Sequence, residues 1–391
     1  MRSRSIVSRG AVLALVSAAC GGGSSGTPAP SLPTSLGPGE GALTVLAWPG
    51  YAENGSTDPS VDWVTPFEKE TGCKVTVQVF GTSDEAFTLF KTNPEQFDVV
   101  SASGDASLRL VAGGFVQPVN VDLVPSYKEI FDSLKDRPWN TVDGVHYGIP
   151  HGRGANLLMW RTDVVNAAPT SWQAMFDPKS AYAGKFSVYD APIYIADAAV
   201  VLMKTRPELG IKNPYALDDT QFAAAVELLK QQKPAVGEYW VDYTKEIDSF
   251  KNGNAVIGTT WQVIANILKD AGVPVETLKP DEGATGWSDT WMINSKTKHL
   301  NCAYRWLNYI TSAKVNIQVA EYFGEAPANR NSCALAENPN HCAIFHAEED
   351  AYWTNVWYWT TPTERCLDGR TDVKCKGFDE WVKAWTDIRS G

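Results

Sequence analysis

Short apolar segments alternate with longer amphipathic segments from residue 42 onward, and this alternation constrains the fold more than any other feature. The apolar segments have the length of strands and the others have helical spacing, an order typical of βαβ units. Such a repeat favours an α/β protein with two lobes of similar build, each around a mainly parallel sheet. The predicted strands are 43–47, 74–79, 97–101, 186–189 and 255–258, and the predicted helices are 65–71, 84–91, 196–204, 219–232 and 243–252, with a last helix, 378–388, packed on a lobe.

The first twenty residues have the features of an export signal. Three arginines precede the apolar run 11–16, and three small residues lead to Cys20. This start resembles a bacterial lipoprotein signal, which would be removed as residues 1–19 and leave Cys20 lipidated, although Ser17 stands where such signals carry leucine. Residues 20–41 are rich in Gly, Ser and Pro and are expected to form a flexible tether. An ordinary cleaved signal is the alternative. In both cases the protein would be exported, to the periplasm or the outer face of the cytoplasmic membrane.

The charge and the aromatic content bear on the partner. The 391 residues include 34 Lys plus Arg against 45 Asp plus Glu, a formal charge of -11. This acidity argues against nucleic acid, whose phosphates require concentrated Lys and Arg, and suits a cationic ligand better. The 15 Trp suit an aromatic-lined cleft, but large cores would account for most of them. No later segment approaches about 20 uninterrupted apolar residues, so membrane contact is expected through the lipid anchor only.

Six cysteines follow Cys20, and the oxidising environment of an exported chain favours disulfides. Six cysteines allow fifteen pairings. A rival hypothesis places zinc between two nearby cysteines, His341 and His346, but the spacing differs from structural zinc patterns. We therefore expect three disulfides and no metal. Proximity in the sequence favours the pairs Cys333–Cys342 and Cys366–Cys375, which leaves Cys73 for Cys302.

The sequence lacks local signatures of catalysis. It has no GxxxxGK[ST] phosphate loop, no HExxH and no Cys-x-x-Cys. Its one GxSxG match, 22–26, lies in the tether, where no strand-to-helix turn can hold the serine. These observations favour binding over catalysis and imply no cofactor. A secreted α/β hydrolase is the alternative from a different class.

Five segments, in order, resemble the periplasmic spermidine/putrescine-binding proteins. They are VLAWPGY (45–51), FEKETG (67–72), FDVVSAS (97–103), GWSDTW (286–291) and AEYFGEAPAN (320–329), and the similarity spans residues 43–330. The resemblance implies a two-lobed type II periplasmic-binding-protein fold, with a cleft that closes over a ligand. It also implies delivery of that ligand to the permease and ATPase of an ABC importer. The expected division is residues 42–152 plus 290–328 for lobe 1 and residues 153–289 plus 329–391, with a C-terminal extension, for lobe 2.

The resemblance assigns ligand contacts to several residues that directly follow predicted strands. Trp48 and Tyr51 match an aromatic wall of the family, Ser103 a ligand-contacting hydroxyl, and Trp261 a cleft tryptophan. Open α/β sheets bind ligands at the carboxyl ends of their strands, which is where these residues lie. Trp48 could instead be a core aromatic, and Ser103 could instead cap a helix over 106–111.

An aromatic and a carboxylate of the family are matched by Trp287 and Asp289. Such a pair suits an amine, because the carboxylate accepts charge-assisted hydrogen bonds and the ring face attracts the cation. Asp190 matches the first of two family acids, but the second is absent. Glu325 and Asp105 replace family tyrosines, so acid is expected to be relocated around the cleft. Asp105 has the helix cap as its alternative, and one residue of 357–359 is expected to supply the final cleft aromatic.

Arg153 stands where the family has an aromatic, near the crossover between the lobes. An arginine there would either be neutralised by an acid of the cleft or hold an anionic part of the ligand. We expect pairing with an acid, because Asp105, Asp190, Asp289 and Glu325 outnumber it. The predicted function is a monomeric, lipid-anchored binding protein for a small polyamine. The alternative is a zwitterionic or anionic solute held by Arg153.

Overall fold

The computed structural model describes residues 32–391. The predicted signal, Cys20 and the first part of the tether lie outside the described residues. Within the described part, no helix combines the length and the apolar character needed to cross a membrane.

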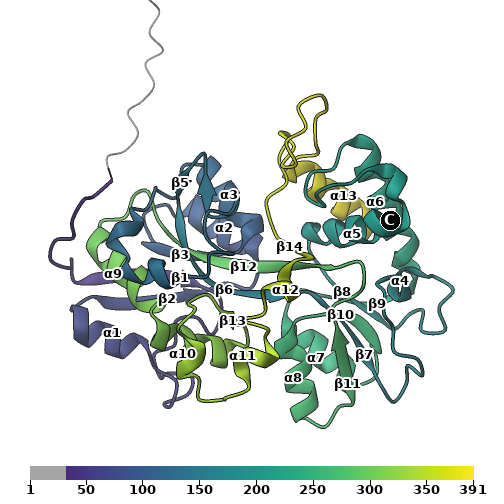
Figure 1. The fold of residues 1–391 in the computed structure, drawn as a ribbon, viewed down its shortest axis with the longest axis horizontal. Coiled ribbons are helices and arrows are strands. Elements are labelled where there is room, and N and C mark those ends of the chain that lie inside the picture. The colour runs from purple at the N-terminus through teal and green to yellow at the C-terminus, as the bar shows by residue number, and fades with distance from the viewer. Residues whose placement is uncertain (1–31) are drawn as a thin grey trace, which may run out of the picture. The chain divides into compact units, whose positions relative to one another are not determined.

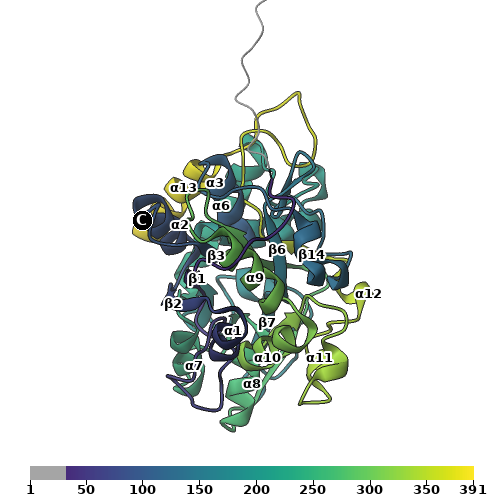
Figure 2. The ribbon, with the colours of Figure 1, turned by 90° about the vertical axis from the view of Figure 1, so that its left-hand side faces the viewer.

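The first lobe is built on a sheet with the strand order β13-β6-β12-β3-β1-β2, in which β14 also pairs with β12 (Figure 1). β1 pairs in parallel with β2 and β3, as βαβ units require. Helices α1, α9 and α10 lie on the side seen in Figure 2 and share one apolar cluster with β1, and α2 and α3 contribute to a second cluster. The strands are β1 (Ala42–Ala47), β2 (Lys74–Val79), β3 (Val99–Ala102), β6 (Gly148–Ala155), β12 (Ala284–Ile293), β13 (Ala326–Pro327) and β14 (Val356–Tyr358), and the helices are α1 (Val64–Thr71), α2 (Ser83–Thr92), α3 (Gly104–Ala112), α9 (Leu300–Ile310) and α10 (Ala313–Phe323).

The second lobe has a sheet with the order β11-β7-β10-β8-β9. The strands are β7 (Leu157–Arg161), β8 (Phe186–Tyr189), β9 (Val236–Trp240), β10 (Ile257–Thr260) and β11 (Val275–Leu278), and the helices are α4 (Gln173–Phe176), α5 (Ile195–Thr205), α6 (Asp219–Gln232), α7 (Tyr243–Lys251), α8 (Gln262–Asp270) and α13 (Phe378–Ser390). The remaining short strands and α-helices are β4 (Thr141–Val142), β5 (Val145–His146), α11 (His341–Ile344) and α12 (Asp350–Trp353), and short 3-10 helices connect several elements. The terminal helix α13 packs on this lobe as predicted, with Trp381 and Trp385 buried, whereas Val382 is 37% exposed.

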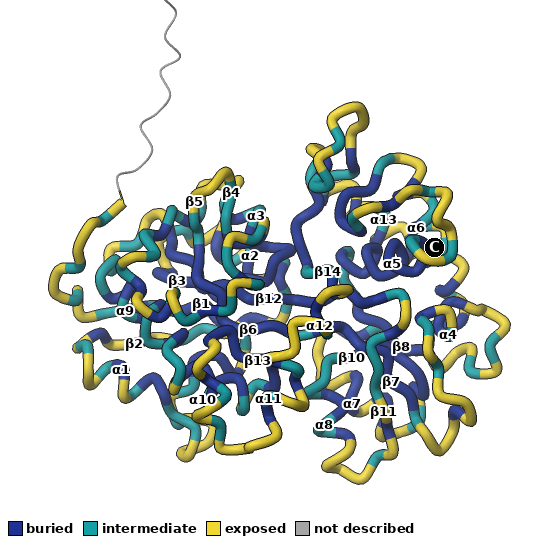
Figure 3. The backbone as a smooth tube through the Cα atoms, viewed as in Figure 1, coloured by how far each residue is buried: buried dark blue, intermediate teal, exposed yellow. Residues whose placement is uncertain are grey.

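Two buried strands carry the chain between the lobes. Only Asn156 separates β6 from β7, so the chain passes directly from the first sheet into the second. Figure 3 shows β6 and β12 as dark blue, buried tube. β6 and β12 pair antiparallel with each other, β12 with β3, and β7 with β10, whereas β12 pairs in parallel with β14. The sheets are mixed, and the prediction of mainly parallel sheets is wrong. The expected lobe boundaries at residues 152 and 290 fall inside β6 and β12, and this division stays a prediction.

The three predicted disulfides are all present. The bonds are Cys73–Cys302, Cys333–Cys342 and Cys366–Cys375, so the pairing favoured by proximity is confirmed. The rival zinc cluster is wrong, because the two sulfurs it needs are bonded to each other and offer no thiolate.

Candidate functional site

Two carboxyl groups lie within hydrogen-bond distance of one tyrosine hydroxyl. One of them belongs to Asp289, in the middle of the crossing strand β12. The Tyr51 hydroxyl lies 2.7 Å from Oδ2 of Asp289 and 2.9 Å from Oε2 of Glu325. The Ser103 hydroxyl donates to the other oxygen of Asp289, at 2.5 Å. All four side chains are buried. The structure therefore brings together four of the predicted site residues, from β12 and from the loops after β1, β3 and α10. These four residues are called the Asp289 cluster below.

Burial controls the protonation of this cluster. It raises the pKa of Asp289 to about 6, and burial together with the charge of Asp289 raises the pKa of Glu325 well above its usual range. The Tyr51 hydroxyl has a single proton and can donate it to only one carboxylate. A proton retained on Glu325 lets that acid donate to the tyrosine oxygen, so both short contacts are satisfied.

No cation of the described chain neutralises the cluster. The nearest basic side chain is His151, with Nε2 at 3.5 Å from Oε1 of Glu325. Burial lowers the pKa of His151 to about 3, so its ring is neutral at physiological pH. No Lys or Arg forms an ion pair with either acid among residues 32–391. The site consequently has the electrostatic character of a receptor for a cation.

Glycines in β6 make the room that these side chains occupy. Gly152 lies opposite Asp289, and a Cβ atom at Gly152 would overlap the carboxyl group of Glu325. A Cβ at Gly154 would overlap the ring of Trp287. The glycines of the HGRGA segment thus let the bulky side chains of Glu325 and Trp287 approach the crossing strand closely.

Aromatic rings continue from the Asp289 cluster into the second lobe. Trp287 has its ring centroid 5.9 Å from Phe323 and 6.4 Å from Trp261. Trp261 lies 5.7 Å from Tyr189, which stacks on Trp359 at 5.5 Å. Of the segment 357–359, Trp359 is therefore the residue that joins this aromatic row.

The indole N–H of Trp287 is buried and has no hydrogen-bond partner among the described residues. His151, Phe323 and Tyr189 were not singled out from the sequence as site residues. Only Tyr189 carries a usable signal, because it ends a predicted strand.

Six of the ten predicted ligand-contacting residues lie outside the Asp289 cluster, and they are Trp48, Asp105, Arg153, Asp190, Trp261 and Trp287. Trp48 packs on Phe80, with ring centroids 4.5 Å apart. Asp105 accepts a hydrogen bond from Ser83, and burial raises its pKa to about 7. Ser103, which belongs to the cluster, directly precedes α3, but its side chain makes no capping hydrogen bond there.

Asp190 is held by the terminal helix. Its carboxylate accepts hydrogen bonds from Trp385 at 2.9 Å and from Arg389 at 3.1 Å. Asp105 and Asp190 both line a cavity of about 160 Å³, together with Tyr189. This second group of acids is therefore connected to the aromatic row through Tyr189.

Arg153 lies on the other face of the crossing strands. It is opposite Ser288 in the pairing of β6 with β12, and the next pair is Gly152 with Asp289. Successive side chains of a strand point to opposite faces, so Arg153 is directed away from Asp289. Its guanidinium donates to a backbone carbonyl at 2.8 Å and lies 4.2 Å from the Trp353 ring. No carboxylate pairs with it among the described residues. The predicted ion pair is wrong, because a carbonyl and aromatic faces hold this cation instead.

A family model for bacterial extracellular solute-binding proteins matches residues 62–343, which is more than half of the chain. The chain belongs to this family. The spermidine/putrescine-binding periplasmic protein of Escherichia coli is 24% identical over 299 residues, which cover 74% of this chain and 82% of that protein. The substrate-binding protein PotD of a Streptococcus pneumoniae spermidine/putrescine ABC transporter has a similar structure, with a TM-score of 0.68 at 17% identity over 89% of this chain and 97% of that chain. The glucopine complex of MotA from A. tumefaciens has a TM-score of 0.67 at 18% identity, over 89% and 99%.

Membership in the family confirms the predicted resemblance, the two-lobed α/β fold and binding in place of catalysis. Members are substrate-binding proteins, not enzymes, which removes the hydrolase alternative. The family also implies a small solute, a permease and an ATPase as partners, and an exported protein.

Proposed function

We propose that this solute-binding protein takes a small linear polyamine, of the putrescine or spermidine class, and delivers it to an ABC importer. The observation that carries the proposal is the pair Asp289 and Glu325, two buried acids on one tyrosine hydroxyl with no cationic side chain paired to them among the described residues. An ammonium group would supply the missing charge and donate to both carboxylates. The adjacent Trp287 ring would pack the methylene chain. Relatives named for spermidine and putrescine support this choice.

A second ammonium group is proposed to bind at the cavity that Asp105 and Asp190 line. The aromatic row between the Asp289 cluster and Tyr189 would then cover the carbon chain of the ligand. Trp48, Trp261 and Ser103 complete the proposed set of contacts. The solute held by Arg153 is disfavoured, because that guanidinium is on the opposite face from Asp289. We also propose that the protein is a monomer, anchored by lipid on Cys20.

Isothermal calorimetry of the purified, ligand-free protein with putrescine and spermidine tests the proposal. Asp289→Asn keeps the size of the side chain and removes its charge. A charge-assisted hydrogen bond contributes roughly 1.5 to 3 kcal/mol, so affinity should fall about ten- to a hundredfold.

The matched control for this variant is Asp122→Asn, which removes an exposed acid of the same lobe and should leave the affinity unchanged. Equal affinity in Asp289→Asn and the unmodified protein would show that Asp289 is not the amine anchor. Failure of every diamine and triamine to bind would refute the polyamine class.

A further inference from the structure

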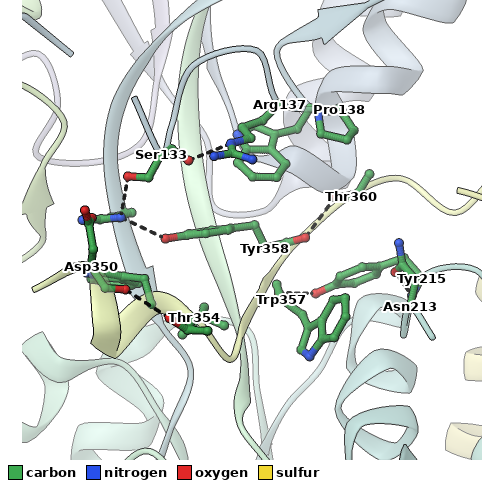
Figure 4. Close-up of a pocket in the computed structure, with 14 residues that line it drawn as sticks. Ser133, Arg137, Pro138, Asn213, Tyr215, Asp350, Thr354, Trp357, Tyr358 and Thr360 are labelled. Carbon is green, nitrogen blue, oxygen red and sulfur yellow. Dashed lines mark hydrogen bonds between the residues drawn. The ribbon is translucent and has the colours of Figure 1, made fainter. Parts of the chain in front are cut away.

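A second cavity, of about 360 Å³, lies at the junction of the two lobes (Figure 4). It is lined by the loop before β4, by residues 213 and 215 of the second lobe, by β14, and by Arg153 on the outer face of β6. No residue of the Asp289 cluster is among the described residues that line it. The cavity is therefore separate from the proposed amine site.

The cavity has an excess of positive charge. Its charged lining residues are Arg137, Arg153 and Asp350. Neither arginine forms an ion pair with a carboxylate in the part of the chain that the structure describes. Arg153 is fully buried and contributes mainly its charge. Arg137 is partly exposed, and its Nε atom donates to the Ser133 carbonyl at 2.7 Å. Its two terminal nitrogens form no hydrogen bond with the described part of the chain, which leaves them open to a ligand. A guanidinium with both terminal nitrogens free matches the geometry of a carboxylate.

The hydrogen-bond donors of the cavity also favour a ligand that carries acceptor atoms. The indole N–H of Trp139 is buried and has no hydrogen-bond partner within residues 32–391, and the residue itself is only 6% exposed. The Tyr358 and Ser133 hydroxyls accept from the Arg153 guanidinium at 3.5 Å and 3.3 Å, and these contacts do not use the hydroxyl hydrogens. A buried donor without an acceptor is unfavourable, so an acceptor-rich ligand would satisfy groups that the protein leaves open.

Aromatic rings form part of the cavity walls. Trp139 and Tyr358 have ring centroids 5.0 Å apart, and Trp357 and Tyr215 also line the cavity (Figure 4). The volume falls in the range of small-molecule pockets. We infer that this cavity is a second binding site, for a small carboxylate with a planar aromatic body. The carboxylate binds the Arg137 guanidinium and the Trp139 N–H, and the ring packs on Tyr358. This site goes beyond the proposed polyamine function and does not depend on it.

Benzoate is the simplest probe, and benzamide is its uncharged counterpart of the same shape. Ligand-observed saturation-transfer NMR titration of the full-length protein should show saturable binding of benzoate and at least tenfold weaker binding of benzamide. Arg137→Gln should weaken benzoate binding about tenfold or more. Arg365→Gln, which removes an exposed arginine outside the cavity, should leave it unchanged.

Two further variants keep the test decisive. Trp139→Phe retains the ring and removes the N–H, and it should weaken benzoate binding severalfold even if Arg137→Gln folds poorly. Asp289→Asn should leave benzoate binding unchanged. The inference is overturned by equal binding of benzoate and benzamide, by no saturable binding, or by benzoate binding that Arg137→Gln and Trp139→Phe do not alter. Benzoate binding that is lost in Asp289→Asn would place the carboxylate in the main cleft and overturn it as well.

Discussion

A single buried hydroxyl links the two acids that define the candidate site. With Asp289 and Glu325 both within hydrogen-bond distance of Tyr51, two negative charges in this buried position would repel each other strongly. Burial and the charge of Asp289 raise the pKa of Glu325, which favours a proton on Glu325 in the empty protein and would remove this repulsion. An ammonium group that enters between the acids would replace that proton as the source of positive charge. The proposed amine binding would thus be coupled to proton release at the level of one side chain.

This coupling predicts that amine binding releases protons. The pKa of Glu325 is raised in the empty site and should fall when a cation arrives, so about one proton per ligand should leave near neutral pH. The pKa of Asp289 is about 6, so below that pH its carboxylate takes up a proton and amine affinity should weaken. Calorimetry in two buffers of different ionisation enthalpy measures the number of protons. In Glu325→Gln that number should approach zero, and an unchanged number would refute the role of Glu325.

Single residues of the candidate site were predictable only where they lie in a sequence segment that resembles a known family. Asp289 and Tyr51 were found because the segments around them resemble those of a known family. His151 and Gly152 were not found, although both contact the site, because their role follows from the pairing of β6 with β12 across more than a hundred residues. The prediction that Arg153 pairs with an acid of the cleft was wrong for the same reason. The face of the sheet to which a side chain points depends on the pairing register of its strand and not on composition.

Elements were predictable where their signals are local. The bounds of α6 agree with the prediction because Asp218 and Gln221 form a capping box, which the sequence itself displays. The strand predicted over 255–258 is instead β10 (Ile257–Thr260), because pairing with β7 and β8 sets its ends. β6 was not predicted at all, since a glycine-rich segment has no alternation of apolar side chains.

A disulfide-closed loop supports the second acid of the site. The loop closed by Cys333 and Cys342 carries His341, whose Nε2 lies 2.8 Å from the backbone carbonyl of Glu325. Burial lowers the pKa of His341, so the ring stays neutral and Nε2 can donate its hydrogen to that carbonyl. Cys333→Ser with Cys342→Ser should release this loop. Amine affinity should then fall about three- to tenfold by calorimetry, the equivalent of one neutral hydrogen bond.

The chain offers a matched control for that loop. Cys366 and Cys375 form a disulfide with the same sequence separation of 9, and their loop makes no described contact with Glu325. Removing this second disulfide should leave amine affinity unchanged. His341→Gln, which keeps a donor, should restore most of the affinity that His341→Ala loses. If both disulfide variants bind the amine equally well, the loop has no positioning role.

At the scale of the molecule, the first lobe is assembled from parts of the chain that are far apart. β1, β2 and β3 come from residues before 103, whereas β12 and helices α9 and α10 come from residues after 283, and the whole sheet of the second lobe lies between them in sequence. The first lobe therefore closes a long loop when it folds, and the entropy of that closure opposes folding. The described residues place one covalent link across this loop, between Cys73 beside β2 and Cys302 on α9.

Removal of that link should destabilise the protein more than removal of a short-range disulfide. The bond Cys73–Cys302 has a sequence separation of 229, against 9 for Cys366–Cys375, and all four cysteines are buried. Because chain-entropy stabilisation grows with loop length, Cys73→Ala with Cys302→Ala should lower the free energy of unfolding by about 2 to 5 kcal/mol in urea titrations without reductant. The loss of unfolding free energy in Cys366→Ala with Cys375→Ala should be smaller. This second variant also truncates two buried side chains, so the difference between the two losses reports the effect of loop length. Equal losses would show that packing at the sulfur atoms, and not closure of the long loop, is what the first disulfide contributes.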